Sequence, residues 1–179
     1  PPYIALFGEW NTTNLGDTAI GIAATKYLLG LGFSVKAFSF GSFSYLGSIT
    51  HECDADEIFH RFRPAVSKKK SLRLAAIHRL TKVKKIKFSA RLARSAIHLS
   101  SVRKELKTCK AVVVGGGELL NDRYDQFMIA LFWITRMVRS QHIPLYCLGC
   151  SINLSSTFLT RTVVRQFLLA SKLISVRDI

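Results

Sequence analysis

The sequence has few of the residues on which specialised protein classes depend. Only 4 of its 179 residues are cysteine, 4 are proline and 11 are glycine. These numbers are too small for a disulfide-rich scaffold or a collagen-like helix. Hydrophobic residues make up 49% of the chain, which excludes disorder as its overall state, because disordered chains are poor in apolar residues. The length suits one compact domain that buries about 70% of the surface its unfolded chain exposes.

Acidic residues are also scarce, with 11 Asp and Glu against 26 Lys and Arg, and the imbalance is local. Residues 60–110 contain 17 Lys and Arg and one acid, Glu105, which gives this segment a net charge of +16. The rest of the chain has 9 Lys and Arg and 10 acids, a net charge of −1. The sequence therefore predicts a nearly neutral globular chain with a basic insertion that could serve as a docking surface.

No apolar run in the sequence is long enough to span a membrane. The most apolar stretch, residues 127–134, ends after eight residues, whereas a transmembrane helix needs about 20. The chain begins at Pro1 without a signal-peptide pattern and ends in a strand-like segment, so we expect it to be an excerpt of a longer protein. Its cysteines fit a reduced cytoplasmic chain at least as well as a secreted one.

Short apolar runs alternate with helical patterns along the chain. The runs at residues 3–7 and 111–114 predict buried strands. Residues 33–38 alternate like a strand, and strands are also expected at 144–148 and 174–179. The helical patterns lie at residues 17–31, 119–139 and 160–171. A loop rich in Ser, Gly and Phe is expected between residue 38 and the basic segment. The alternation predicts an α/β fold, a doubly wound and mostly parallel Rossmann-like sheet in a single domain, 1–179, with a basic helical insertion at about 60–110.

The basic segment is predicted to be helical for most of its length. Apolar residues spaced three or four apart from Leu72 to Ile97 form one stripe, and Lys and Arg occupy much of the remaining surface. This pattern suits an amphipathic helix packed on the sheet, or a surface at 68–94 that attracts an anionic membrane. Nucleic acid is not expected as a partner, because only Phe62 and Phe88 are available in the segment to stack on bases.

Two glycine-bearing loops are the candidate ligand sites. The loop at 8–20 follows the first predicted strand, and the loop at 115–122 follows the strand at 111–114. Ligands of open α/β sheets bind at the carboxyl ends of strands, where helix N-termini present free N–H groups. Three consecutive glycines at 115–117 let the backbone approach a ligand without Cβ atoms in between. Neither loop matches a dinucleotide fingerprint or a P-loop, so each signal is weak alone.

Taken together, four stretches of the chain resemble the motifs of one family. Gly8 and Asn14–Ile20 resemble the opening motif of the polysaccharide pyruvyl transferases, and Gly115–Asp122 resembles their second motif. Gly149–Ile152 is similar to the third motif of that family, and Ile174–Asp178 to its strand-exit motif. The four stretches occur in order and span nearly the whole chain, which is therefore identified as a member of this family.

The resemblance implies the N-terminal half of a GT-B-like two-domain enzyme, whose C-terminal domain is absent from this chain. Such enzymes move the enolpyruvyl group of phosphoenolpyruvate onto two hydroxyls of one sugar in a cell-surface polysaccharide precursor. The products are a cyclic ketal and phosphate. Phosphoenolpyruvate is the donor substrate, and no cofactor or metal is expected. A lipid-linked glycan acceptor would give the basic segment the role of docking at the inner face of the membrane.

This chemistry and the resemblance together suggest the site residues. A base must deprotonate a sugar hydroxyl, an acid must protonate the enol carbon, and cations must hold the carboxylate and phosphate of the donor. Arginine suits the last task because its guanidinium fork matches both anions. The candidate catalytic carboxylates are Asp17, Glu118 and Asp122. The candidate substrate-binding residues are Asn14, Gly16, Gly115, Gly116, Gly117, Ser151, Arg161 and Arg177.

These residues also have purely structural explanations. Asp17 can be the N-cap of its helix, and the Asn and Gly residues of the first loop can serve only the turn. Glu118 and Asp122 are expected in the first turn of a helix, where the helix dipole favours acids. Cys147 and Cys150 have the spacing of a metal or redox pair, but no second pair accompanies them, so buried strand-end cysteines are expected.

Two other functions stay open at this point. A GT-B-like glycosyltransferase that uses a nucleotide sugar would share the fold, and ligand-induced thermal stabilisation would distinguish the two enzymes. A non-catalytic basic module that binds membrane or nucleic acid would share the charge. Such a module would bind duplex DNA with a steep salt dependence, and alanine at the three candidate carboxylates would change nothing.

Overall fold

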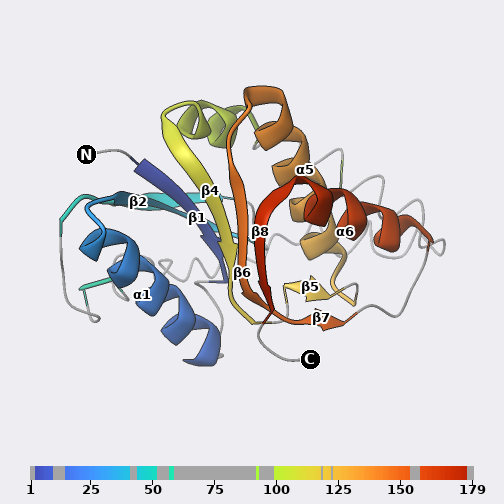
Figure 1. The fold of residues 1–179 in the computed structure, drawn as a ribbon, viewed down its shortest axis with the longest axis horizontal. Helices are drawn as coiled ribbons and strands as arrows, with labels where there is room; N and C mark the ends of the chain where they lie inside the picture. Colours follow the sequence, from blue (N-terminus) through green and yellow to red (C-terminus); the bar gives the residue numbers. More distant parts are fainter. Residues whose placement is uncertain are drawn as a thin grey trace, which may run out of the picture.

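The computed structural model describes residues 3–9, 15–40, 44–51, 57–58, 92, 99–117, 119–121, 123–153 and 158–176. In this part of the chain the main sheet has the strand order β3-β2-β1-β4-β6-β8, and all neighbouring strands are parallel except β2 and β3 (Figure 1). The strands are β1 (Tyr3–Gly8), β2 (Ser34–Ser39), β3 (Ser44–Ile49), β4 (Cys109–Gly115), β6 (Leu145–Cys150) and β8 (Ser171–Val176).

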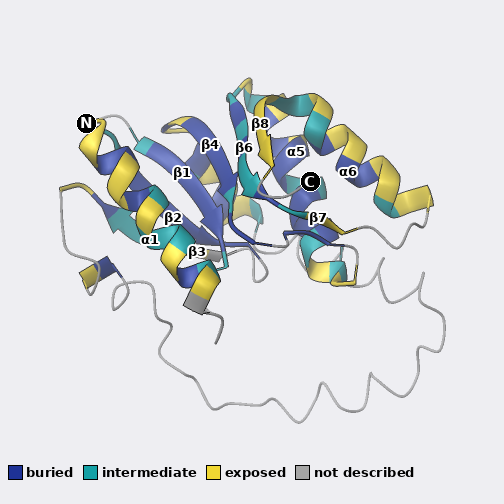
Figure 2. Ribbon diagram, turned by 60° about the horizontal axis from the view of Figure 1, so that its bottom comes forward, coloured by how far each residue is buried: buried dark blue, intermediate teal, exposed yellow. Residues whose placement is uncertain are grey.

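Helices cover both faces of this sheet. The crossovers are α1 (Leu15–Gly30) from β1 to β2, α5 (Asp125–Gln141) from β4 to β6, and α6 (Phe158–Ala170) from β6 to β8. The helix α1 packs on one face, and α5, α6 and the helical residues 99–106 pack on the other. Figure 2 shows β1, β2 and β4 buried, whereas the edge strand β8 and the outer sides of the helices are exposed. The predicted doubly wound, mostly parallel α/β fold is confirmed.

The central strands are apolar on both sides because both faces of the sheet are covered. Residues 4–7 of β1 are all at most 5% exposed, and every residue of β2 is buried. The rings of Phe7 and Phe38, on neighbouring strands, stack with centroids 4.6 Å apart. Burying side chains of this size contributes about 1.5–3 kcal/mol each. This packing fixes the positions of the strand ends from which the candidate loops start.

The helix predicted at 119–139 begins later than expected, at Asp125. Leu120 and Asn121 instead form a short strand, β5 (Leu120–Asn121), which pairs in parallel with β7 (Ile152–Asn153). The side-chain oxygen of Asn121 accepts a hydrogen bond from the Arg123 N–H at 2.9 Å, which stabilises a turn before the helix. Residues 118 and 122, which were expected in the first helical turn, lie outside the described residues.

The loop expected after residue 38 contains the antiparallel edge strand β3. Ile49 of this strand is fully buried, and the rings of Tyr45 and Phe38 lie 5.3 Å apart between centroids. Ser44, Gly47 and Ser48 interrupt the apolar pattern of β3, so periodicity alone gave no strand signal here. The register of β3 on β2 also shifts between Ala37 and Phe38.

None of the described helices combines the length and the apolarity needed to cross a membrane. The basic segment predicted as a membrane surface, 68–94, lies outside the described residues except for residue 92. The predicted helix at 17–31 begins two residues earlier, at Leu15, and the one at 160–171 begins at Phe158.

Candidate functional site

The strand order reverses between β1 and β4, which are neighbours in the sheet. From β1 the chain passes through α1 to β2 on one side, and from β4 through α5 to β6 on the other. At such a switch point the two following connections diverge and leave a crevice at the carboxyl ends of the strands, where ligands of this fold class bind. Both candidate loops begin there, after Gly8 and after Gly115.

Asp17 and Gly117 bring the two loops into contact at this crevice. Asp17 lies in the first turn of α1, so it is part of the helix and not its N-cap. Gly117 has a φ of +25°, and a Cβ atom at this position would collide with Oδ1 of Asp17. The carboxylate therefore occupies the space that a side chain at residue 117 would need. The convergence of the two loops at one edge of the sheet is confirmed for these residues.

Gly116 and Ser151 extend the contact on either side. A Cβ atom at Gly116, whose φ is +113°, would lie 4.0 Å from Cγ2 of Ile20 on α1. The N–H of Ser151, just after β6, donates to the carbonyl oxygen of Gly117 at 3.0 Å. The turn at residues 115–117 is thus held between the start of α1 and the end of β6. Gly16 is exposed at the beginning of α1.

Cys147 and Cys150 are buried beneath this turn. The register of β6 on β8 shifts between them, and Gly149 has a φ of +62°. This bulge places both thiols in the same core cluster. Hydrogen bonding to Cys147, together with burial, raises the pKa of the Cys150 thiol far above its ordinary value, and the same bond lowers the pKa of Cys147. Both cysteines are free and buried, as predicted.

Asn121 is a site-proximal residue to which sequence reasoning gave no role. Its side chain is 1% exposed although it is polar, and it lies on β5, only four residues beyond Gly117. The pairing of Asn121 with Asn153 joins the segment after β4 to the segment after β6. In the sequence, the feature that could have indicated Asn121 is its position as a polar residue at the end of a glycine-rich motif.

Four of the predicted site residues, Asn14, Glu118, Asp122 and Arg177, lie outside the described residues. Their roles stay predictions. Arg161 is described, and it lies on the exposed side of α6. That helix packs on the sheet face opposite α1, so Arg161 is not part of the contact between Asp17 and Gly117.

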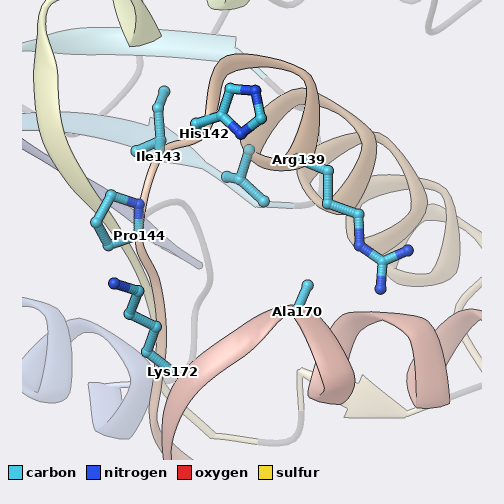
Figure 3. Close-up of a pocket in the computed structure, with 7 residues that line it drawn as sticks. Arg139, His142, Ile143, Pro144, Ala170 and Lys172 are labelled. Carbon is cyan, nitrogen blue, oxygen red and sulfur yellow. The ribbon is translucent and has the colours of Figure 1, made fainter.

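A cavity of about 290 Å³ lies at the amino ends of the strands, where β6 and β8 begin (Figure 3). Its lining residues include three with side-chain nitrogen atoms, Arg139, His142 and Lys172. The helices α5 and α6 end beside it, and the partial negative charge of helix C-termini favours cations. This cavity is therefore separate from the switch-point crevice.

The chemistry available at the crevice follows from these contacts. The helix α1 begins beside the glycine turn, and helix N-termini in general favour anionic ligands. Asp17 adds a half-buried carboxylate that can accept or donate a proton. The fold and the site together define a doubly wound α/β protein with a candidate ligand crevice at its topological switch point.

Comparison with known families identifies this protein more closely. The family model for polysaccharide pyruvyl transferase matches residues 14–179. The chain therefore belongs to the polysaccharide pyruvyl transferase family, as its motifs predicted, and this family implies a transferase that acts in polysaccharide biosynthesis. Comparisons with curated proteins and with solved structures give no match.

Proposed function

We propose that the protein transfers the enolpyruvyl group of phosphoenolpyruvate to a sugar of a cell-surface polysaccharide precursor. One sugar hydroxyl adds to C2 of the donor while C3 takes up a proton, and a second hydroxyl then displaces phosphate from C2. Two O–H bonds of the sugar, the C2–O bond to phosphate and the C2=C3 π bond break. Two C–O bonds, one C3–H bond and one O–H bond of phosphate form. One hydroxyl proton is balanced at C3 and the other leaves with phosphate.

The observation that supports this proposal is the contact between Asp17 and Gly117 at the switch point. It places a carboxylate beside a turn that has no side chains, so a small ligand can lie against the backbone and the carboxylate at once. Phosphoenolpyruvate is small and carries two anionic groups, which the N-terminus of α1 would favour. In this proposal Asp17 transfers a proton, with Glu118 and Asp122 as the other candidate acid and base.

The donor anions also need cations. We assign this role to Arg177, which follows β8, together with further groups from a second domain. In the proposed two-domain, GT-B-like enzyme, the residues around this crevice form one wall of the cleft. Ser151 and Gly16 complete this wall, and Asn14, which precedes α1 in the sequence, is a further candidate ligand residue.

The direct test is to incubate the full-length enzyme with phosphoenolpyruvate and candidate lipid-linked glycans. We expect release of phosphate and a product with the mass of the pyruvate ketal. Asp17→Asn keeps the size of the side chain but removes its acid–base function, so kcat should fall about 10²–10⁴-fold with a small change in KM for the donor. Stabilisation by a nucleoside diphosphate, without any by phosphoenolpyruvate, would instead indicate a glycosyltransferase.

We further propose that the basic segment at 68–94 docks the enzyme on the inner leaflet, where a lipid-linked acceptor would be presented. Charge reversal of Lys82, Lys84, Lys85 and Lys87 should weaken binding to anionic liposomes. Unchanged binding would reject this role of the segment while leaving the proposed reaction untouched.

A further inference from the structure

The outer side of α6 carries large apolar side chains at positions where a surface helix normally has polar ones. Phe158 is 88% exposed, Leu169 65% and Leu159 50%. With 3.6 residues per turn, Phe158, Thr162 and Leu169 lie along the middle of the exposed side, opposite the buried residues of the helix. The helix is thus apolar both toward the core and toward solvent.

Cations flank this apolar line, and acids are missing from the whole region. Arg161 and Arg165 are exposed on the same side of α6 as Phe158. Residues 126–176 contain 5 Lys and Arg and no Asp or Glu. The outer surface formed by α5, α6 and the start of β8 therefore combines exposed apolar groups with positive charge alone.

The positive charge continues past the end of the helix. Arg139 of α5 donates to the side-chain oxygen of Gln166 on α6 at 2.8 Å, which ties the two helices together at their exposed sides. Arg139 and Lys172 also line the cavity beside the C-terminus of α6 (Figure 3). The cationic groups thus extend from Arg161 past the C-terminus of α6.

This combination fits an anionic bilayer better than a second copy of the chain. A copy packed on α6 across a two-fold axis would place arginines against arginines, with no acid in 126–176 to pair with them. At a bilayer, large apolar side chains enter the boundary between headgroups and acyl chains, while arginines bind lipid phosphates with their guanidinium forks.

We propose that the exposed face of α6, formed by Phe158, Leu159, Arg161, Arg165 and Leu169, docks on an anionic lipid bilayer. The inference deepens the proposed function, because it rests on an acceptor presented at a membrane. It concerns residues of α6 and not those of the basic segment at 68–94.

Binding to vesicles of phosphatidylcholine with and without phosphatidylserine tests the charge. Arg165→Glu with Lys172→Glu changes the net charge by −4 and should lower the partition coefficient at least about 30-fold at low salt, since each basic residue near the surface contributes about 5-fold. The matched control is Lys26→Glu with Lys110→Glu, which makes the same charge change at exposed positions outside α6. This control should lower binding less than 5-fold.

Phe158→Trp tests insertion, because its emission should shift to the blue and be quenched by brominated acyl chains. Tyr27→Trp is the control, since Tyr27 is 67% exposed on α1, on the other side of the sheet. The proposal would be overturned by equal quenching of the two tryptophan variants or by equal effects of the two charge variants. Loss of a dimer on Phe158→Ser would also overturn it. Pyruvyl transfer to a water-soluble acceptor should be normal in Arg165→Glu, so failure of docking and failure of the proposed reaction give different results.

Discussion

Replacing Gly117 with alanine tests the geometry of the candidate site directly. Two costs arise at this position. The φ of +25° lies in the region that disfavours side chains, which costs about 1–2 kcal/mol. The new Cβ would also collide with Asp17 and push this side chain out of its position, at about 0.5–1.5 kcal/mol for a strained rotamer. We therefore expect the free energy of unfolding to fall by about 2–3 kcal/mol.

Two other glycines separate these costs. Gly32 has a φ of +81° but nothing within 4 Å of its Cβ position, so Gly32→Ala should cost only the backbone strain of about 1–2 kcal/mol. Gly30 ends α1, also with nothing within 4 Å and without a positive φ. Gly30→Ala should stabilise the protein by up to about 1 kcal/mol. Urea unfolding of the three variants measures all of these values.

The double variant Asp17→Ala with Gly117→Ala removes the collision but keeps the backbone strain. It should show a favourable coupling of about 1 kcal/mol in a double-mutant cycle. The reasoning would be refuted if Gly117→Ala cost no more than Gly32→Ala and the cycle showed no coupling. In that case Asp17 would not pack against the glycine turn, and the two loops would not form one site.

Three further predictions concern other parts of the fold. His142 adopts a left-handed conformation, with φ of 55°, at the end of α5, so His142→Gly should raise thermal stability by about 0.5–1 kcal/mol. Lys36 is 8% exposed and forms a 3.0 Å ion pair with Glu105. Glu105→Gln leaves the Lys36 ammonium without its charged partner, so the free energy of unfolding in urea should fall by about 2–3 kcal/mol. This loss should exceed that caused by Lys36→Met. Burial raises the pKa of Cys109 to about 11 from 9.0. The stability that the protonated thiol contributes is therefore complete below pH 9 and is lost as the pH rises to 11. Between these pH values the protein should lose about 2 kcal/mol more than Cys109→Ala, and equal losses would contradict this.

The sequence was sufficient for the fold class because the buried strands are continuous apolar runs. Residues 4–7 and 111–114 read as strands without any tertiary information, and they are the two central strands of the sheet. The edge strand β3 was missed because Ser44, Gly47 and Ser48 leave no clear period. Edge strands are held by pairing with one neighbour, which a local pattern does not report.

The site was predictable in its location but not in its contacts. Strand–loop–helix order places Asp17 and the glycine turn at one edge of the sheet by topology alone. The fit of the Asp17 carboxylate against Gly117 depends on the relative positions of α1 and β4, which are far apart in sequence. The late start of α5 likewise depends on β5 pairing with β7, since Leu119 and Leu120 fit a helix equally well on local pattern.

The topology also explains why the two ends of the sheet differ in charge preference. Each right-handed crossover starts its helix at the carboxyl edge of the sheet and ends it at the amino edge. The N-termini of α1, α5 and α6 therefore lie on the side of the crevice, and the C-termini of α5 and α6 lie at the cavity lined by Arg139 and Lys172. Helix dipoles favour anions at the first edge and cations at the second. The cations at the cavity thus have nearby partial negative charge, whereas an anionic donor gains most at the crevice beside Asp17 and Gly117.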